Sequence, residues 1–304
     1  MTRRELLHAA AAGPAGKGVQ PTILVHEHVL VDFIGAGQIG PERYDPDEVF
    51  RVARPKLEAA ARLGCVRLLE ATPAYLGRDA RLMKRLSGAT GVDIWINTGI
   101  YGAANHKYVP AWAREAPAPE LARRWIEEAR KGVDGVKPRF IKTGVNKAPL
   151  HELDRKLVRA AAIASRETGL TIASHTNSGA AALEELEIIA SEKVAASRFV
   201  WVHAHTEKDH AFHEKAARAG AWLEFDGLRP QSADWHLHCL EFASAKGLLQ
   251  QALLSHDAGW YRPGEPGGGN YRDYTYLYTD FLPRLDPAWI RVLLWDNPRR
   301  AYGA

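Results

Sequence analysis

Histidines stand at or near the ends of several short apolar segments. Thirteen of the 304 residues are histidine, and His26 and His28 lie two positions apart in Val25-His26-Glu27-His28. Similar segments end in His175, His203, His205 and Asp257. Neutral imidazoles and carboxylates are natural ligands of zinc and related divalent ions. One His-x-His pair alone would carry little weight, but the recurrence of such groups in separate segments indicates a metal site.

A lysine occupies an equivalent position in another apolar segment, Phe140-Ile141-Lys142-Thr143-Gly144. Metal ions should repel the ammonium form of Lys142. The position makes sense if the amine has reacted with carbon dioxide, because the resulting carbamate is an anion with two oxygens. Such a group can bridge two cations about 3.5–4 Å apart, the usual spacing in two-metal sites. The lysine therefore favours a centre with two metal ions.

Eight short segments rich in β-branched residues recur along the chain, and they predict strands. They cover residues 22–31, 66–72, 93–101, 139–146, 171–177, 199–206, 221–228 and 251–258. Apolar spacing of three and four predicts helices between them, over residues 46–63, 150–168 and 180–193. This alternation favours a parallel sheet that is covered on both faces.

Eight strand–helix units favour an α/β fold of the (β/α)8 TIM-barrel type, as a single domain over residues 21–304. An open dinucleotide-binding sheet would need a Gly-x-Gly-x-x-Gly turn where the chain has His26-Glu27-His28. In such barrels the chemistry lies at the C-terminal ends of the strands, which is where the polar residues fall. Because strand side chains alternate with a period of two, His26 and His28 should face the barrel mouth and Glu27 should point outward.

Composition and charge exclude several classes of protein. The chain is 46% hydrophobic and 25% charged, as is ordinary for a globular protein. Its formal net charge is +4 with both signs interspersed, which argues against nucleic-acid binding. Cys65 and Cys239 cannot build a disulfide framework. No apolar run reaches the roughly 18 residues that a membrane span needs.

The first residues contain Arg3-Arg4, which resembles the start of a twin-arginine export signal. The apolar region that should follow is interrupted by His8 and soon reaches Gly13-Pro14. We therefore interpret residues 1–20 as the N-terminal tail of a cytoplasmic protein. A vestigial export signal and a periplasmic location are the alternative.

Five pieces of the chain resemble, in order and spacing, the phosphotriesterase-like group of the amidohydrolase superfamily, which includes phosphotriesterase-related proteins and lactonases. These pieces are Val25-His26-Glu27-His28, Lys142, Ser174-His175-Thr176, Val202-His203 and Ser255-His256-Asp257. The resemblance implies a TIM-barrel hydrolase with a binuclear metal centre, a homodimer as the assembly, and a small ester or lactone as the substrate.

The resemblance also implies a role for each ligand. The implied ligands are His26, His28 and Asp257 for the more buried metal, and His175 and His203 for the more exposed one. Carboxylated Lys142 and a hydroxide would bridge the two ions, and Asp257 would take the proton from that hydroxide. Metal coordination lowers the pKa of water from 15.7 to about 7, which supplies a nucleophile at neutral pH. Zinc is the expected ion, with manganese, cobalt or iron as alternatives.

Three further residues are candidates beside the metal ions. Thr98-Gly99-Ile100-Tyr101 resembles the end of the third strand in the lactonase branch, where a tyrosine approaches the hydroxide and the lactone oxygen. Asp226 aligns with a position near the group's proton shuttle. His205 follows His203 by two positions, so on a strand it would face the same side and relay protons or replace His203 as a ligand. A structural role is the alternative for all three, and we expect one for His256.

The loop after the last strand, residues 259–271, is rich in glycine, proline and aromatic residues, which is typical of a functional loop. We interpret it as a mobile lid with Trp260, Tyr261 and Arg262 available for substrate contact. Lys107, in the segment 102–112, should face it across the mouth. Lys107 and Arg262 would favour a substrate with a carboxylate or phosphate, unless both are merely solvated loop residues.

The predicted function is hydrolysis of a lactone at a two-metal centre, with phosphotriesterase activity as a promiscuous side reaction. The sequence Phe225-Asp226-Gly227 lacks the arginine and tyrosine that quorum-signal lactonases place after this aspartate, which argues against an acyl-homoserine lactone. The alternatives are a phosphodiester or phosphate-ester hydrolase and a catalytically silent barrel that acts as a binding protein. A deaminase of the same superfamily would need no lysine at position 142.

Overall fold

The computed structural model describes residues 20–303, and its strands are short and parallel. They are β1 (Thr22–Glu27), β2 (Cys65–Glu70), β3 (Asp93–Trp95), β4 (Asn97–Thr98), β5 (Phe140–Gly144), β6 (Ile172–His175), β7 (Phe199–Val202), β8 (Trp222–Phe225) and β9 (Ala252–Leu254). Only Ile96 separates β3 from β4, so these two pieces together form one of eight strand positions. The structure describes nothing of residues 1–19, where most of the predicted tail lies.

The strands form a closed ring. Ladder pairing runs in the order β1-β2-β3 and β4-β5-β6-β7-β8-β9. The ring closes between its first and last strands, because Asp257 N donates to His26 O at 3.0 Å and His28 N donates to Ala258 O at 2.9 Å. Across the break between β3 and β4, Arg139 N donates to Ile96 O at 2.9 Å. The molecule is therefore the (β/α)8 barrel that the sequence predicts.

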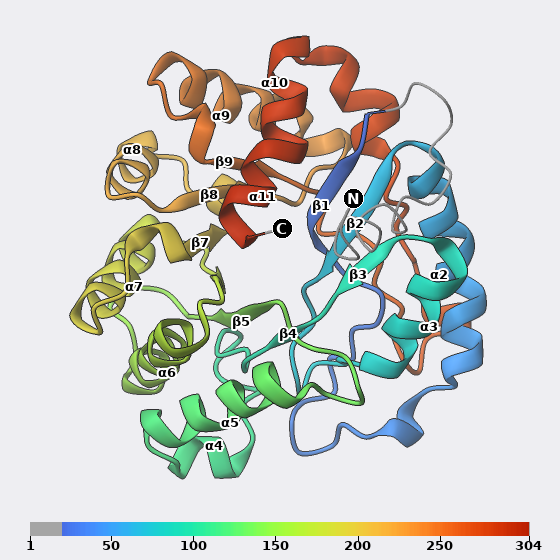
Figure 1. The fold of residues 1–304 in the computed structure, drawn as a ribbon, viewed down its shortest axis with the longest axis vertical. Coiled ribbons are helices and arrows are strands. Elements are labelled where there is room, and N and C mark those ends of the chain that lie inside the picture. The colour runs from blue at the N-terminus through green and yellow to red at the C-terminus, as the bar shows by residue number, and fades with distance from the viewer. Residues whose placement is uncertain (1–19, 304) are drawn as a thin grey trace, which may run out of the picture.

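Helices surround this ring of strands (Figure 1). They are α2 (Pro46–Arg62), α3 (Ala80–Thr90), α4 (Ala111–Glu115), α5 (Ala118–Lys131), α6 (Glu152–Thr168), α7 (Gly179–Ser191), α8 (His210–Arg218), α9 (Ala233–Ala245), α10 (Pro287–Arg291) and α11 (Asn297–Tyr302). In α2, the Asp45 side chain accepts from Asp47 N and caps the helix, and Pro46 occupies its first turn. The three helices predicted from apolar spacing agree with α2, α6 and α7 within two residues at each end.

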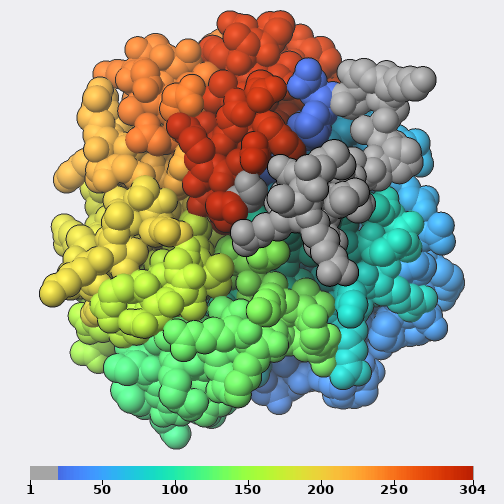
Figure 2. All heavy atoms as spheres, viewed as in Figure 1, coloured from blue at the N-terminus to red at the C-terminus, as the bar shows by residue number. Residues whose placement is uncertain are grey.

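The inside of the ring is a packed apolar core at the end opposite the metal-ligand candidates. Inward-facing residues of the strands, such as Val25, Phe140 and Val200, pack there against Ala301 and Tyr302 of α11. Figure 1 shows α11 near the middle of the ring, and Figure 2 shows the C-terminal residues on the face of the molecule seen in that view. The C-terminal helix thus closes one end of the barrel and leaves the other end open for a site.

Several strands end earlier than the sequence predicts. The strand predicted over residues 199–206 stops at Val202, and a 3-10 turn, η3 (Ala204–Thr206), follows. The strand predicted over residues 22–31 stops at Glu27. Within the described part of the chain, no helix has the length and apolar character to cross a membrane.

Candidate metal centre

His26, His28 and Asp257 converge at the open end of the barrel. The Nε2 atom of His28 lies 3.1 Å from an Asp257 carboxylate oxygen, and the Nε2 atom of His26 lies 3.8 Å from the same oxygen. One potential ligand atom from each of the three residues lies within 4.8 Å of the others. Both imidazoles are buried, as expected for the more enclosed of two ion sites.

His175 and His203 lie beside this group. Their ring centroids are 4.3 Å apart, and the ring of His203 is 5.2 Å from that of His26. Burial lowers the pKa of His26 to about 4 and that of His175 well below its usual range, and the nearby Lys142 adds to both shifts. Both histidines are therefore neutral at pH 7, which is the form that binds metals.

Lys142 projects from β5 and is buried, with 2% of its surface exposed. Its Nζ atom has no hydrogen-bond partner among residues 20–303. Burial lowers the pKa of this amine, although Glu224, Asp226 and Asp257 oppose the shift. A buried amine with a lowered pKa and no hydrogen-bond partner among the described residues fits the predicted carbamate, because only the uncharged form of an amine reacts with carbon dioxide. The residues present therefore fit a two-metal centre.

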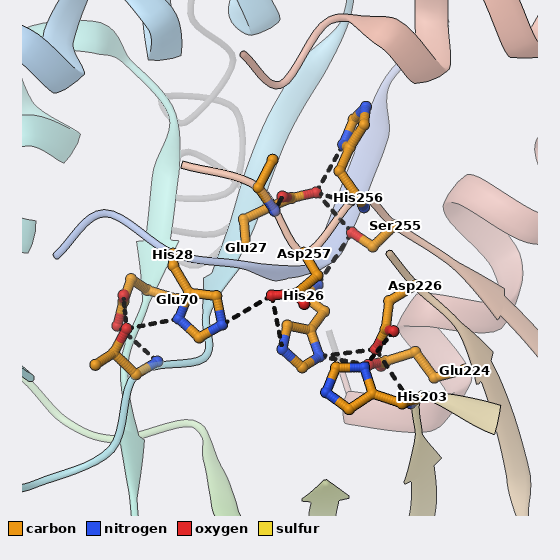
Figure 3. A network of polar contacts seen from close by, with 12 residues as sticks. His26, Glu27, His28, Glu70, His203, Glu224, Asp226, Ser255, His256 and Asp257 are labelled. Carbon is orange, nitrogen blue, oxygen red and sulfur yellow. Dashed lines mark hydrogen bonds and ion pairs between the residues drawn. The ribbon is translucent and has the colours of Figure 1, made fainter. Parts of the chain in front are cut away.

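A second layer of carboxylates holds the predicted ligands in place (Figure 3). Asp226 accepts a hydrogen bond from Nδ1 of His203 at 2.5 Å and lies 3.1 Å from Nδ1 of His26. The Nδ1 atom of His28 lies 2.7 Å from the hydroxyl of Thr72, which in turn donates to Glu70. Carboxylate and hydroxyl partners of this kind fix the orientation of metal-binding imidazoles. The predicted proton-shuttle residue Asp226 thus lies behind the ligands and positions two of them.

Glu224 is a buried member of this layer that is not among the site residues predicted from the sequence. It lies two positions before Asp226, accepts from Nδ1 of His26 at 2.7 Å, and meets the hydroxyl of Tyr302 at 3.2 Å. Burial and the neighbouring charge of Asp226 raise the pKa of Glu224 well above its usual range. The period of two in Glu224-Phe225-Asp226 was the available signal, because it places both carboxylates on the inner face of the barrel.

Glu27 faces away from the ligands, as predicted, but it is fully buried. It forms hydrogen bonds with the residues on both sides of Asp257 in the sequence. Its carboxylate accepts from the hydroxyl of Ser255 at 2.9 Å and from Ala258 N at 2.8 Å. His256 also contacts this carboxylate through Nδ1 at 2.8 Å, so it has the structural role expected for it. Glu27 therefore fixes the backbone on both sides of Asp257, whose φ of 54° lies in the left-handed region.

The prediction for His205 rested on a strand that is not there. The chain leaves β7 at Val202, His203 has a φ of 64°, and His205 lies in η3. The argument that His203 and His205 share one strand face is therefore wrong. His205 nevertheless lies near the centre, with its Nδ1 atom 3.3 Å from Asp226 and its side chain in the wall of a cavity.

Two cavities share walls formed by predicted metal ligands. The larger has a volume of about 430 Å³, and the smaller about 130 Å³. Both are lined by His175, His203, Asp257 and Trp260. Tyr101 lines the smaller cavity, with its ring centroid 5.0 Å from that of His175. Arg262 lines the larger one. The positions of Trp260, Tyr101 and Arg262 agree with the substrate contacts predicted for them, which stay predictions.

Neither Tyr261 nor Lys107 lines these cavities, so the substrate contact predicted for Tyr261 needs correction and the one predicted for Lys107 stays a prediction. Tyr261 is buried in a core cluster on the outside of the strand ring, and its backbone N donates to Val29 O at 2.9 Å. Lys107 donates from Nζ to Phe33 O at 2.6 Å. The side chain at position 261 points away from the mouth because the loop pairs with the segment after β1, through a bridge between Leu30 and Tyr261. The loop predicted as a lid is thus folded against the barrel in this structure.

Comparison with known proteins gives consistent relatives. The family model described as the phosphotriesterase family matches residues 9–302. The phosphotriesterase homology protein of Escherichia coli (strain K12) is 27% identical over 92% of this chain and 97% of its own length. The aryldialkylphosphatase of Saccharolobus solfataricus is 29% identical over 90% of this chain and 85% of its own length. The phospho-furanose lactonase of Mycoplasmopsis synoviae is 25% identical over 75% of this chain and 72% of its own.

Solved structures share the fold. A variant of the organophosphorus hydrolase from Deinococcus radiodurans superposes with a TM-score of 0.82, at 24% identity, over 96% of each chain. The similarity extends over nearly the whole chain, which supports the assignment of a single barrel domain.

Proposed function

The chain belongs to the phosphotriesterase family and is an ester-bond hydrolase, and we propose that it opens a lactone ring at a two-metal centre, with phosphotriesters as promiscuous substrates. The observation that carries this proposal is the amine of Lys142, which is buried and has no hydrogen-bond partner among residues 20–303. The imidazoles and carboxylates near it are, together with a carbamate, the ligands that a carbamate-bridged pair of ions requires. The names of the relatives from Saccharolobus and Mycoplasmopsis support the two substrate classes.

The proposed metal-holding residues form two groups that share one bridge. His26, His28 and Asp257 would hold one ion, His175 and His203 the other, and carboxylated Lys142 both. We propose zinc as the ion in each position. When bound, such ions lower the pKa of coordinated water to about 7 and polarise the substrate carbonyl.

The other residues of the centre bind, orient or carry protons. Asp257 lies at the border of both cavities, so its carboxylate can accept a proton and release it toward solvent. Burial and the charge of Asp257 raise the pKa of Tyr101, so its phenol stays protonated at neutral pH. Tyr101 can therefore donate a hydrogen bond to a lactone oxygen in the smaller cavity.

The test is a substrate panel with the zinc-loaded protein: γ- and δ-lactones, aryl phosphotriesters and phosphodiesters. We expect the highest kcat/KM for a lactone. Lys142→Ala should lose at least about 100-fold in kcat and regain part of it with short-chain carboxylates, which can replace the carbamate. Lys137→Ala, at an exposed lysine just before β5, is the matched control. Unchanged turnover in Lys142→Ala, or fewer than two metal ions per chain, would contradict the proposal.

A phosphate-ester hydrolase is the second candidate, and the observation that favours it is the set of arginines in the larger cavity. A phosphodiester cleaved faster than every lactone in the panel would select this candidate. Turnover of no ester at all would favour the silent barrel.

We also propose that the protein is a cytoplasmic homodimer that acts on a small molecule and binds no nucleic acid. The family resemblance supports the dimer, and the interspersed charges support the absence of a nucleic-acid surface. Sedimentation of the metal-loaded protein and fractionation of the cells that make it would test the two statements.

A further inference from the structure

We propose that Asp154, His106 and Asn146 are positioning residues of this site, and that together they hold the loop after β4, residues 101–110, in the conformation that places Tyr101 beside His175. The inference rests on the proposed function, because it concerns how the phenol of Tyr101 is kept within reach of a lactone oxygen. The three residues, called the anchor residues below, line neither of the two cavities.

The loop adopts a backbone conformation that its residues do not favour. Ala104, Asn105 and His106 have φ angles of 54°, 54° and 62°, so three consecutive residues lie in the left-handed region. Outside glycine, this is the longest such run within residues 20–303. Residues with a Cβ atom adopt this region at a cost in free energy, and they remain there only where the surrounding structure enforces it. Contacts from outside the loop must therefore hold it.

These contacts come from the connection between β5 and α6. Asp154, in the first turn of α6, is fully buried, and its Oδ1 atom accepts from Nε2 of His106 at 2.8 Å. The Oδ1 atom of Asn146 accepts from Asn105 N at 2.9 Å. Its Nδ2 atom donates to Gly102 O at 3.2 Å and to Oδ1 of Asp154 at 3.2 Å. The anchor residues thus bind the loop at Gly102, Asn105 and His106.

The burial of Asp154 is costly for a contact that holds a surface loop. Within residues 20–303, no lysine or arginine lies within ion-pair distance of its carboxyl group, and His106 is the one ionisable partner there. Taking such a pair out of water offsets much of its attraction, so an apolar side chain of similar size would stabilise the fold at least as well. We therefore attribute the acid at this position to the placement of the loop.

The loop supplies part of the wall of the smaller cavity. Tyr101, Ala104 and Tyr108 all line this cavity. The ring centroid of Tyr101 lies 5.8 Å from that of Tyr108 and 5.0 Å from that of His175, a predicted metal ligand. Relaxation of the left-handed residues between Tyr101 and Tyr108 would therefore shift this wall relative to the metal ligands.

Such a shift should affect the reaction even though the anchor residues do not touch the substrate. A hydrogen-bond donor such as Tyr101 acts on a reacting group only over a narrow range of distance and angle, and a displacement of about 1 Å can cost about 100-fold in rate. The anchor residues thus act through Tyr101, and their loss should reduce kcat/KM without removing the metal ions.

The first experiment compares His106→Met with His106→Gln in the zinc-loaded protein, on the lactone that the wild type cleaves best. Glutamine keeps an N–H donor that can reach Asp154, and methionine removes it. We expect kcat/KM per bound zinc to fall by about 10-fold in His106→Met and by less than about 3-fold in His106→Gln, with two zinc ions retained in both.

The control for this comparison is His238→Met, at an exposed histidine on α9 that lines neither cavity, and it should match the wild type. Equal losses in His106→Met and His106→Gln would overturn the proposal, because the donor to Asp154 would then have no effect. Wild-type kcat/KM in His106→Met would overturn it as well.

A double-mutant cycle tests whether the anchor residues act through Tyr101. In a Tyr101→Phe background, the additional loss caused by His106→Met should shrink from about 10-fold to about 2-fold or less, because the displaced hydroxyl is already absent. A loss that stays at about 10-fold in this background would show that His106 acts elsewhere, and the proposal would fail.

Hydrogen exchange followed by mass spectrometry separates this inference from the proposed function, because it requires no turnover. In His106→Met and Asn146→Ala, amide exchange in a peptide that covers residues 102–110 should be at least about 10-fold faster than in the wild type, with exchange in α2 unchanged. Faster exchange without turnover of any lactone would overturn the proposed function and keep the role of the anchor residues in holding the loop. Turnover of lactones with unchanged exchange in this peptide would overturn the inference about the anchor residues alone.

Discussion

Asp226 is the residue that joins the two halves of the predicted centre. Its carboxylate contacts Nδ1 of both His203 and His26, one predicted ligand of each ion. Burial alone would raise the pKa of Asp226, but the two histidines, through their charge when they are protonated and through their hydrogen bonds, outweigh burial and hold the pKa well below its usual range. The ionised carboxylate therefore keeps both imidazoles in the tautomer that leaves Nε2 free to bind a metal.

We expect Asp226→Asn to weaken zinc binding by about 10- to 100-fold, because an amide cannot accept from both histidines with the strength of a carboxylate. Competition with a chelator measures this affinity directly. Asp234→Asn is a suitable control, since Asp234 is exposed on α9 and, within residues 20–303, forms an ion pair only with Arg284. Equal zinc affinity in Asp226→Asn and the wild type would show that the carboxylate does not position the ligands.

For single residues, the sequence predicts well which residues form the site and predicts poorly which residues they contact. The six predicted ligands were recognisable because a histidine, lysine or aspartate at the end of an apolar strand is costly unless it has a task. The structure brings all six together. The period of two places Glu224 on the inner face of the barrel, but its contact with His26 was not predictable, because His26 is 198 positions away in the chain. The same holds for Glu27, whose partner Ser255 is 228 positions away.

Among the elements, the segment after β9 passes close to the backbone after β1 at Gly259. Gly259 has a φ of 90°, and a Cβ atom there would lie 1.7 Å from the backbone oxygen of His28. Gly264 in the same loop has a φ of 87°, but nothing lies within 4 Å of its Cβ position. The two glycines therefore share the conformational requirement and differ only in the close contact.

Gly264→Ala should cost about 1–2 kcal/mol in the free energy of unfolding, the penalty for a left-handed conformation. Gly259→Ala should cost clearly more and should also weaken zinc binding, because the displaced backbone carries His28 and Asp257. Urea denaturation and chelator competition on both variants give the two quantities. Similar losses in the two variants would mean that the loop can move away from β1 without affecting the ligands.

Helix α7 contributes a buried acid behind β6. Glu185 accepts hydrogen bonds from Ser174 and Thr176, which flank His175. Burial raises its pKa to about 8 in spite of these bonds. Between the usual value near 4.5 and this value, the folded state keeps a proton that the unfolded state has lost. The free energy of unfolding should therefore fall as the pH rises through this range.

Glu185→Gln removes this proton and keeps a side chain of similar shape. Its stability relative to the wild type should improve between pH 5 and pH 8, by up to about 1 kcal/mol per pH unit. Urea denaturation of the metal-loaded proteins at several pH values measures the difference. Glu187→Gln, on the exposed side of the same helix, is the control. A constant difference between Glu185→Gln and the wild type across this range would show that Glu185 is ionised in the folded protein.

Whether a segment forms a helix or a strand was predictable from the sequence, whereas the residue at which each element ends was less predictable. Apolar periodicity depends on which side chains face the core, and this property is local. The end of β7 depends instead on the positive φ of His203, which the interaction of its backbone and ring with Asp226 stabilises. No pattern within the segment 199–206 contains that contact. Because β7 ends at Val202 and not at residue 206, the inference that His203 and His205 share one strand face fails.

At the scale of the whole molecule, the C-terminal helix α11 contributes to the stability of the barrel. Asn297, at the start of α11, is fully buried and donates from its side chain to Leu249 O at 2.8 Å and to Ala252 O at 2.7 Å. Thr171 before β6 binds Ala301 O at 2.6 Å. These bonds attach the helix to strands on different sides of the ring, so it acts as a cross-link over the closed end.

We expect Asn297→Ala to lower the free energy of unfolding by about 2–4 kcal/mol, because it removes the two hydrogen bonds that this buried side chain donates to backbone carbonyl groups. Asn270→Ala, at an exposed asparagine in the loop after β9, should change it by less than about 0.5 kcal/mol. Since Asn297 lies at the end of the barrel opposite the ligands, the variant should still bind two zinc ions per chain when folded. Loss of zinc at temperatures at which the barrel stays folded would contradict this expectation. It would show that the closed end of the barrel affects metal binding at the open end.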